Sequence, residues 1–327
     1  MSEFVKRERK RRNKRYLLIS VLIAVLAALG VSYYYQFIIT VYDFSGRLSR
    51  LDIKTDISPM AEHLALVGDV DVNADDITSE SALLAGDGKE VLAAKFATKR
   101  MNPASTTKVM TALVALKYGN LNDEVTIPQE SVITEAGASL AGISPGDVLT
   151  LDQLLYGLML PSGNDAANAI AVHIGGSIEN FVKMMNDEAG RIGAVDTHFV
   201  NVHGLTDPEH YTTAYDLYII FNEALKDSRF LNYAGASSYS VEYTAADGST
   251  VTKTWKNGNR FITGQVQAPD GIVVEAGKTG TTIAAGSCLV IGSDDGKGNR
   301  FISVILKSAN RADLYDNMYK LLLKIDK

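Results

Sequence analysis

The chain has 327 residues, of which 46% are hydrophobic and 21% are charged, a composition typical of globular proteins and a length sufficient for one large domain. Its only cysteine, Cys288, excludes an intrachain disulfide and cannot build a zinc or iron–sulfur site by itself. The net charge is −6, but residues 1–15 carry +6, which leaves −12 for the remainder. Because a nucleic-acid-binding domain is normally basic where it is folded, this distribution excludes nucleic acid as an expected partner.

The N-terminus combines a basic tail with a long apolar segment. The 27 residues of 16–42 carry no charge, and about 20 apolar residues suffice to span a bilayer as a helix. The basic residues predict that 1–15 stays in the cytoplasm while the chain after the apolar segment is exported. We expect 16–41 to be an uncleaved, single-pass membrane anchor. The alternative is a signal peptide cleaved near Ala28 and Gly30, which would give a secreted protein.

The order of the predicted elements after this segment indicates the fold class. Residues 42–78 are polar and irregular and are expected to form a linker, and a folded domain is expected over 79–327. The domain is predicted to contain two strands, a block of helices, a hairpin, three strands and a closing helix: Ser81–Leu84, Glu90–Lys95; Ala104–Lys117, Leu151–Leu160, Asp165–Ile174, Ile178–Ile192, Ala214–Ala224; Tyr239–Thr244, Val251–Trp255; Ile272–Thr279, Ser287–Ser293, Arg300–Lys307; and Ala312–Ile325. A mostly helical insertion within one antiparallel sheet is an α+β arrangement.

The first of three motifs is the only Ser-x-x-Lys of the chain. Ser105 and Lys108 are expected one turn apart on one face of a helix that Pro103 precedes. A serine hydroxyl needs a base to become a nucleophile, and a lysine is a base only when burial or a nearby cation lowers its pKa. Lys278 is the candidate for that cation. Alone this motif is weak, because a surface lysine on an ordinary helix gives the same pattern.

The second motif, Ser162-Gly163-Asn164, is expected at a turn between two helices. There the serine can relay a proton, and the asparagine can hold both a lysine amine and a substrate amide. Ser308-Ala309-Asn310 has the same pattern, but it follows the last predicted strand and is interpreted as a loop.

The third motif, Lys278-Thr279-Gly280, ends a predicted strand. Its lysine and threonine offer a cation and a hydroxyl to a carboxylate, and Gly280 lets a substrate backbone approach closely. An edge strand at this place can bind an extended peptide by strand addition. The backbone amides of Thr281 and Ser105 can together form an oxyanion hole. The three motifs in this order are typical of penicillin-binding proteins and class A β-lactamases.

Longer segments around the motifs resemble those of the low-molecular-mass penicillin-binding proteins, the D-alanyl-D-alanine carboxypeptidase family. The resemblance covers about residues 79–327, and Gly163 stands where that family's S-D-N motif has aspartate. The segments that carry it are 102–112, 158–167, 197–205, 210–217 and 277–289. It implies a β-lactamase/transpeptidase-like fold, an antiparallel sheet flanked by helices, and no metal or cofactor.

The resemblance also implies a reaction on a peptidoglycan stem peptide that ends in D-Ala-D-Ala. Ser105 would attack the carbonyl of the penultimate D-alanine with Lys108 as base, D-alanine would leave, and water would hydrolyse the acyl-enzyme. The implied further roles are proton relay and substrate holding for Ser162 and Asn164, and binding of the terminal carboxylate for Lys278 and Thr279. β-Lactam antibiotics imitate the dipeptide and are expected to acylate Ser105.

Several alternatives stay open beside this interpretation. Relatives cleave peptidoglycan cross-links with the same motifs, so a D,D-endopeptidase is one, and a membrane-tethered penicillin sensor without turnover is another. A class A β-lactamase is disfavoured because no Glu-x-x-Leu-Asn segment follows Asn164. A zinc peptidase built on His198, His203 and His210 is disfavoured because the chain has no His-Glu-x-x-His and their spacing fits a loop.

Overall fold

The computed structural model describes residues 72–86 and 90–325. The predicted basic tail, the apolar segment 16–41 and residues 42–71 of the predicted linker lie outside the described residues. Among the helices that are described, none is both long and apolar enough to cross a membrane.

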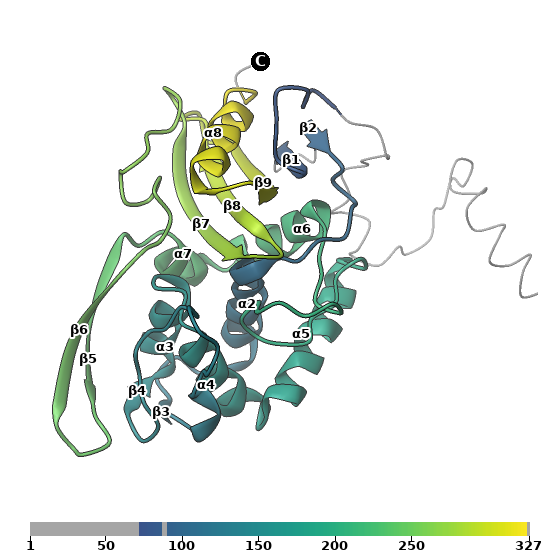
Figure 1. Ribbon diagram of the computed structural model, residues 1–327. Coiled ribbons are helices and arrows are strands. Elements are labelled where there is room, and N and C mark those ends of the chain that lie inside the picture. Colours follow the sequence, from purple (N-terminus) through teal and green to yellow (C-terminus); the bar gives the residue numbers. More distant parts are fainter. Residues whose placement is uncertain (1–71, 87–89, 326–327) are drawn as a thin grey trace, which may run out of the picture. The chain divides into compact units, whose positions relative to one another are not determined.

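A five-stranded antiparallel sheet joins the two ends of the described chain (Figure 1). Its strand order is β2-β1-β9-β8-β7, so β7 is an edge strand. The N-terminal strands meet the C-terminal ones where β1 pairs with β9 and Leu83 lies opposite Val304. The strands are β1 (Ser81–Gly86), β2 (Val91–Lys95), β7 (Val273–Thr282), β8 (Gly286–Asp294) and β9 (Arg300–Ser308).

Both faces of this sheet are covered by helices (Figure 1). Along β1, Leu83 and Ala85 belong to the core shared with the helical layer, whereas Ala82 and Leu84 belong to the core under α8 (Arg311–Leu322). A strand buried on both faces is a continuous apolar run without alternation, as the sequence SALLAG of β1 shows.

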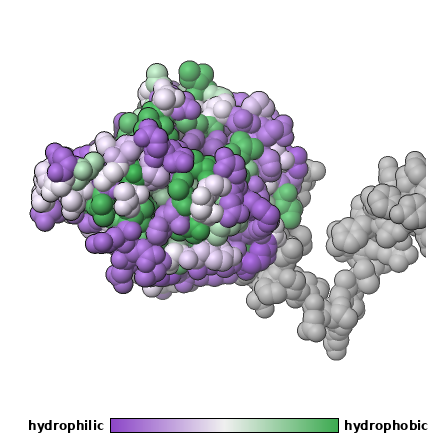
Figure 2. Space-filling view, turned by 90° about the horizontal axis from the view of Figure 1, so that it is seen from below, coloured by the Kyte–Doolittle hydropathy of each residue, from purple (hydrophilic) through white to green (hydrophobic). Residues whose placement is uncertain are grey.

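The helical layer is built around α2 (Lys108–Tyr118), of which nine of eleven residues are buried. Serine and threonine side chains cap three of the neighbouring helices by accepting a backbone N–H: Thr150 caps α3, Ser177 caps α5 and Thr213 caps α6. The surrounding helices are α3 (Leu151–Met159), α4 (Asn164–Gly175), α5 (Ile178–Ile192), α6 (Ala214–Leu225) and α7 (Ser228–Ala234). Seen from below, hydrophobic patches interrupt a largely hydrophilic surface (Figure 2).

A second sheet of four short strands lies beside these helices, in the order β3-β4-β5-β6. The hairpin β5–β6 was predicted, and β4 joins it through the single pair Val148–Thr244. The sequence analysis did not predict β3, β4 or α7, since three-residue strands and a seven-residue helix show no readable periodicity. The strands are β3 (Glu124–Thr126), β4 (Val148–Thr150), β5 (Ser238–Thr244) and β6 (Thr250–Lys256).

The described structure confirms the α+β class with an antiparallel sheet and a mostly helical insertion. One expected boundary was wrong, because residues 72–78 pack on the domain and do not form part of a free linker. Val72 pairs with Ala94, the side chains of Ala74 and Ile77 are buried, and the Thr78 amide donates to Asn317. These residues close the outer face of the sheet together with α8.

Candidate active site

Ser105 lies in η2 (Ala104–Thr107), a single 3₁₀ turn that leads into α2. The helix predicted from residue 104 therefore starts with a tighter turn. Ala104 has a φ of 49°, in the left-handed region that residues with a Cβ rarely adopt. Gly204 packs against its carbonyl group so closely that an added Cβ would lie 1.8 Å from the oxygen. The unusual conformation before the serine is thus held by a neighbouring loop that requires glycine.

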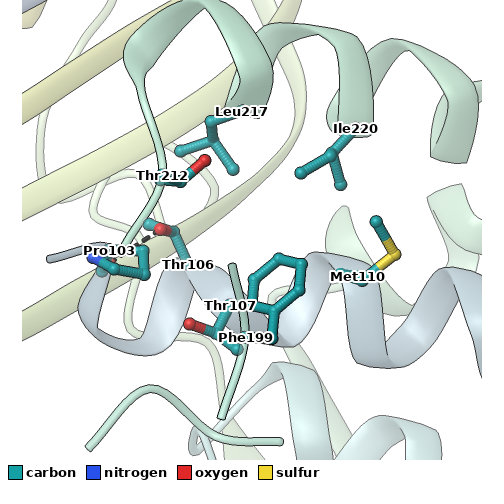
Figure 3. A pocket seen from close by; sticks show the side chains of 8 residues that line it. All are labelled: Pro103, Thr106, Thr107, Met110, Phe199, Thr212, Leu217 and Ile220. Carbon is teal, nitrogen blue, oxygen red and sulfur yellow. Dashed lines mark hydrogen bonds between the residues drawn. The ribbon is translucent and has the colours of Figure 1, made fainter. Parts of the chain in front are cut away.

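Figure 3 shows what packs behind this turn. The Thr106 and Thr107 hydroxyls donate to the carbonyl oxygens of Pro103 and Ala104, at 2.7 and 2.8 Å. The gap between the turn and its neighbours has no room for a water molecule. Its remaining lining residues are Met110, Phe199, Thr212, Leu217 and Ile220. The nucleophile segment is therefore held by dry packing and internal hydrogen bonds.

Lys108 follows Ser105 by three residues, and its side chain is completely buried. Its Nζ donates to Ser105 Oγ at 3.1 Å, to Asn164 Oδ1 at 2.7 Å and to the His203 carbonyl oxygen at 2.9 Å. Burial, and then the positive charge of Lys278, lower the pKa of Lys108 well below its ordinary range. A neutral amine beside Ser105 Oγ is able to accept the serine proton.

Lys278 makes the corresponding contact with the second serine of the site. Its Nζ donates to Ser162 Oγ at 3.0 Å and to the Thr279 carbonyl oxygen at 3.1 Å. Burial lowers the pKa of Lys278 to about 7. Ser162 itself has a φ of 63°, so its turn, like that of Ala104, is in the left-handed region. The two serines of the motifs are thus each bonded to one buried lysine.

Strand β7 approaches the nucleophile turn at Gly280. A Cβ at this position would lie 2.9 Å from the Ser105 amide nitrogen and 3.0 Å from Ala104 Cβ. The strand does not end at Thr279 as predicted but continues to Thr282, so Gly280 and Thr281 lie inside the sheet's edge strand. This close approach brings strand backbone beside the Ser105 amide, as an oxyanion hole formed by the amides of Ser105 and Thr281 requires.

A cleft of about 630 Å³ opens over Ser105. Asn164 and Thr281 from the motifs line it together with Ser105. The other residues of its wall are Glu135, Ala136, Gly137, Ala138, Ser139, His203, Gly204, Leu205, Thr206, Thr282, Ile283 and Ala284. The structure therefore brings Ser105, Asn164 and Thr281 to one cleft, while Lys108 bonds to two of them and Lys278 bonds to Ser162.

The second Ser-x-Asn pattern is placed elsewhere, as expected. Asn310 caps α8 by accepting the amides of Ala312 and Asp313, and Ser308 bonds to Ser79 at 2.6 Å between the hydroxyl oxygens. In this second pattern Asn310 therefore caps the last helix, and Ser308 takes part in a buried hydrogen bond.

His210 is a site residue that the sequence analysis considered only as a zinc ligand. Its Nδ1 accepts the Val200 amide at 3.1 Å, so Nε2 carries the proton and donates to Thr107 Oγ1 at 2.8 Å. Thr107 Oγ1 in turn donates to the Ala104 carbonyl oxygen. Burial lowers the pKa of His210 to about 4, which keeps the ring neutral at pH 7. His210 thereby supports the turn that carries Ser105.

The three histidines of the zinc hypothesis make separate contacts. His198 Nδ1 lies 2.6 Å from the Glu209 carbonyl oxygen, and His203 Nδ1 accepts the Leu205 amide at 3.3 Å. Over 72–86 and 90–325, no group of three histidine, cysteine or acidic side chains is arranged to hold a metal ion.

Asp165 was also missed, since an acid in the first turn of a helix is common on surfaces. It is buried, and its carboxylate accepts the amides of Ala141 and Gly142, both at 2.8 Å, and of Ile143 at 3.2 Å. Asp165 follows Asn164, which bonds to Lys108, so the same helical turn holds the lysine and the loop that forms one wall of the cleft.

Fold and site together give the arrangement of Ser-x-x-Lys, Ser-x-Asn and Lys-Thr-Gly motifs that is typical of penicillin-binding proteins. The chain matches the family described as D-alanyl-D-alanine carboxypeptidase over residues 69–310. It is 34% identical over 248 residues to the D-alanyl-D-alanine carboxypeptidase DacF of Bacillus subtilis, covering 74% of this chain and 60% of that protein. It is 35% identical over 227 residues to a D-alanyl-D-alanine carboxypeptidase of Streptomyces, covering 66% of this chain and 76% of that one.

A solved structure has the same fold. The crystal structure of a Streptomyces DD-transpeptidase superposes with a TM-score of 0.71 at 32% identity, covering 77% of this chain and 98% of that chain. The chain therefore belongs to the D-alanyl-D-alanine carboxypeptidase family. It spans 60% of the length of the Bacillus subtilis relative.

Proposed function

We propose that this protein is a serine-type D-Ala-D-Ala carboxypeptidase that releases the terminal D-alanine of peptidoglycan stem peptides. The observation that carries the proposal is the contact of 3.1 Å between Lys108 Nζ and Ser105 Oγ, made by a lysine whose pKa burial lowers. This pair supplies the nucleophile and its base without a histidine.

In the acylation step, Ser105 Oγ attacks the carbonyl carbon of the penultimate residue while its proton passes to Lys108. The negative charge on the carbonyl oxygen is stabilised by the amides of Ser105 and Thr281. Lys278 and the Thr279 hydroxyl hold the terminal carboxylate. The peptide bond breaks as the proton taken up by Lys108 passes to the leaving nitrogen by way of Ser162, whose hydroxyl contacts Lys278, and Lys108 is again a neutral amine. D-Alanine departs, and an ester to Ser105 remains.

In the deacylation step, a water molecule attacks the ester that links Ser105 to the peptide. Lys108 accepts a proton from the water as the oxygen attacks the ester carbon, and Ser105 recovers its own proton when the ester bond breaks. The products are the shortened peptide, with a new terminal carboxylate, and the free enzyme.

The same site explains an expected sensitivity to β-lactam antibiotics. A β-lactam carries an amide carbonyl and a carboxylate at a spacing that imitates D-Ala-D-Ala, so it would acylate Ser105. Glu135 is the only acidic residue that lines the cleft among the described residues, and it lies on a loop without a partner that would position it as a base. Slow turnover of the penicilloyl-enzyme is therefore expected.

The N-terminal sequence supports a location at the cell membrane with the catalytic domain outside the cytoplasm. Residues 1–15 are strongly basic and the 27 residues that follow carry no charge. A protease added to intact cells stripped of their wall should remove the catalytic domain and leave a tagged N-terminus protected. Protection of both ends, or release of the whole domain into the medium, would overturn retention at the membrane with this orientation.

The activity is tested with two substrates. The full chain in detergent is incubated with a pentapeptide ending in D-Ala-D-Ala and, separately, with cross-linked stem-peptide dimers. A carboxypeptidase releases free D-alanine from the pentapeptide. Cleavage of the dimers alone would indicate a D,D-endopeptidase, and stoichiometric penicillin binding with neither reaction would indicate a sensor.

A further inference from the structure

The cleft over Ser105 is larger than a D-Ala-D-Ala dipeptide requires. Its volume is about 630 Å³, and the groups assigned to the dipeptide, Ser105, Asn164 and Thr281, form only part of its wall. The remaining wall comes from the loop around Glu135, from residues 203–206, and from the end of β7 with the turn after it. There is consequently room beside Ser105 for the substrate residue that precedes D-Ala-D-Ala.

The loop around Glu135 is tied to the catalytic helix turn and forms a defined wall. The Asn164 amide donates to the Ser139 carbonyl oxygen at 2.9 Å, and Asp165 accepts three amides of the residues that follow. On the other side, Asn168 Nδ2 donates to the Glu130 carbonyl oxygen at 2.7 Å. Glu135 thus lies between two anchored points, on the element that also positions Asn164.

Glu135 is the only charged side chain at the wall of this cleft among the described residues. It is exposed, and it makes no ion pair or side-chain hydrogen bond within 72–86 and 90–325. The two lysines of the site are buried below the cleft and bonded to serines. A carboxylate that is free and faces a substrate channel attracts a substrate cation.

Apolar side chains lie on this wall beside polar ones such as Ser139, Thr206 and Thr282. Ala136 and Ala138 flank Glu135, and Leu205 and Ile283 line the cleft as well. The side chain of Ile283, at the turn between β7 and β8, is fully exposed. Small and aliphatic surfaces near one carboxylate suit a side chain that has a long methylene stem and a cationic end.

We infer that Glu135 determines specificity for the residue before D-Ala-D-Ala, by pairing with a side-chain ammonium at the end of an aliphatic stem. The inference rests on the proposed function, because it names the peptides that this site prefers. Glu135 takes no part in bond making or breaking, so its replacement changes the choice of substrate and leaves the acylation machinery intact.

The test compares three peptides of the form acyl-X-D-Ala-D-Ala, where X is lysine, Nε-acetyl-lysine or glutamate. The full-length protein should show a kcat/KM for lysine about fivefold above that for Nε-acetyl-lysine, the effect of one ion pair at a partly open site. Glu135→Gln should abolish this preference. Glu135→Lys should reverse it toward glutamate. Glu130→Gln is the matched control, an exposed acid on the same segment that does not line the cleft, and it should behave as the parent protein.

Penicillin acylation of Ser105 separates the failure of this inference from the failure of the proposed function. All four proteins should acylate at the same rate, because penicillin lacks the ammonium. Equal preference for the three peptides in the parent protein, or a lysine preference that survives in Glu135→Gln and Glu135→Lys, would overturn the inference. D-Alanine release from none of the peptides, despite normal acylation, would refute the carboxypeptidase function itself.

Discussion

Lys108 Nζ lies 3.1 Å from Ser105 Oγ and 2.7 Å from Asn164 Oδ1, and its third acceptor is a backbone carbonyl oxygen. All three acceptors are uncharged. The cost of burying the ammonium is therefore not offset by a direct ion pair, and the neutral amine is favoured. The sequence motif specifies the residue types, and burial gives the lysine the protonation state that the reaction needs.

Replacing Lys108 by arginine should remove the base and put a permanent positive charge in its place. A guanidinium stays protonated in proteins, so it cannot take the serine proton. We expect penicillin acylation to slow by about 10²- to 10⁴-fold, the usual contribution of a general base. Stopped-flow acylation measures this rate. Lys117→Arg, on the same helix and paired with Glu188, is the control and should be unchanged. Equal rates for both variants would show that Lys108 is not the base.

The pH dependence of kcat/KM should reflect the protonation state of Lys278. Burial lowers the pKa of Lys278 to about 7, so its ammonium is present below pH 7 and is lost as the pH rises through 7. If that ammonium holds the substrate carboxylate, kcat/KM for D-alanine release should fall above about pH 7. Lys278→Arg remains charged, and in this variant the fall should move to higher pH, although the maximum rate drops. An unchanged profile in Lys278→Arg would contradict the assignment.

Adding one methyl group at Gly280 should impair acylation without unfolding the protein. The new Cβ would lie 2.9 Å from the Ser105 amide nitrogen and displace the strand from the nucleophile turn. Loss of an oxyanion-hole donor costs about 10²- to 10³-fold in rate, and Gly280→Ala should approach that loss. Gly190→Ala, where nothing lies within 4 Å of the added group, is the control. Parent-like acylation in Gly280→Ala would rule out this packing argument.

His210 should affect the rate of acylation more than substrate affinity. Its ring holds Thr107, which bonds to the Ala104 carbonyl next to Ser105. In His210→Ala, kcat should fall while KM stays near the parent value, and His210→Gln should recover part of the loss. The free energy of unfolding should also fall by about 1–3 kcal/mol, because the Val200 amide and Thr107 lose their partner. His198→Ala removes a half-buried imidazole from the same region as a control. An equal effect of both alanine variants would show that His210 has no special role.

The fold class and the long helices were predictable because their patterns are local. Helix α5 was predicted with the bounds that the structure gives, Ile178–Ile192, where a serine precedes it and Gly193 follows it in the left-handed conformation. The last two strands, β8 and β9, were predicted within a few residues, since each is a run of mostly buried, largely apolar residues. Strand β7 was predicted too short, because it ends in the polar residues Thr281 and Thr282, which line the cleft and continue no apolar pattern.

The motif residues of the site were also predictable, whereas the residues that support them were not. Gly204, Asp165 and His210 act on groups that are far away in the sequence, such as the Ala104 carbonyl and the amides of 141–143. A single sequence carries no signal for these contacts. The left-handed φ of Ala104 was equally hidden, since alanine is not a residue that marks such a turn.

The most direct test of the central claim is the release of D-alanine from a pentapeptide ending in D-Ala-D-Ala by the full chain and by its Ser105→Ala variant. The variant removes only the hydroxyl, which contacts Lys108. The account predicts steady release by the parent protein, and neither release nor penicillin labelling by Ser105→Ala, with unchanged thermal unfolding. Release that persists in Ser105→Ala would contradict the assignment of Ser105 as the nucleophile.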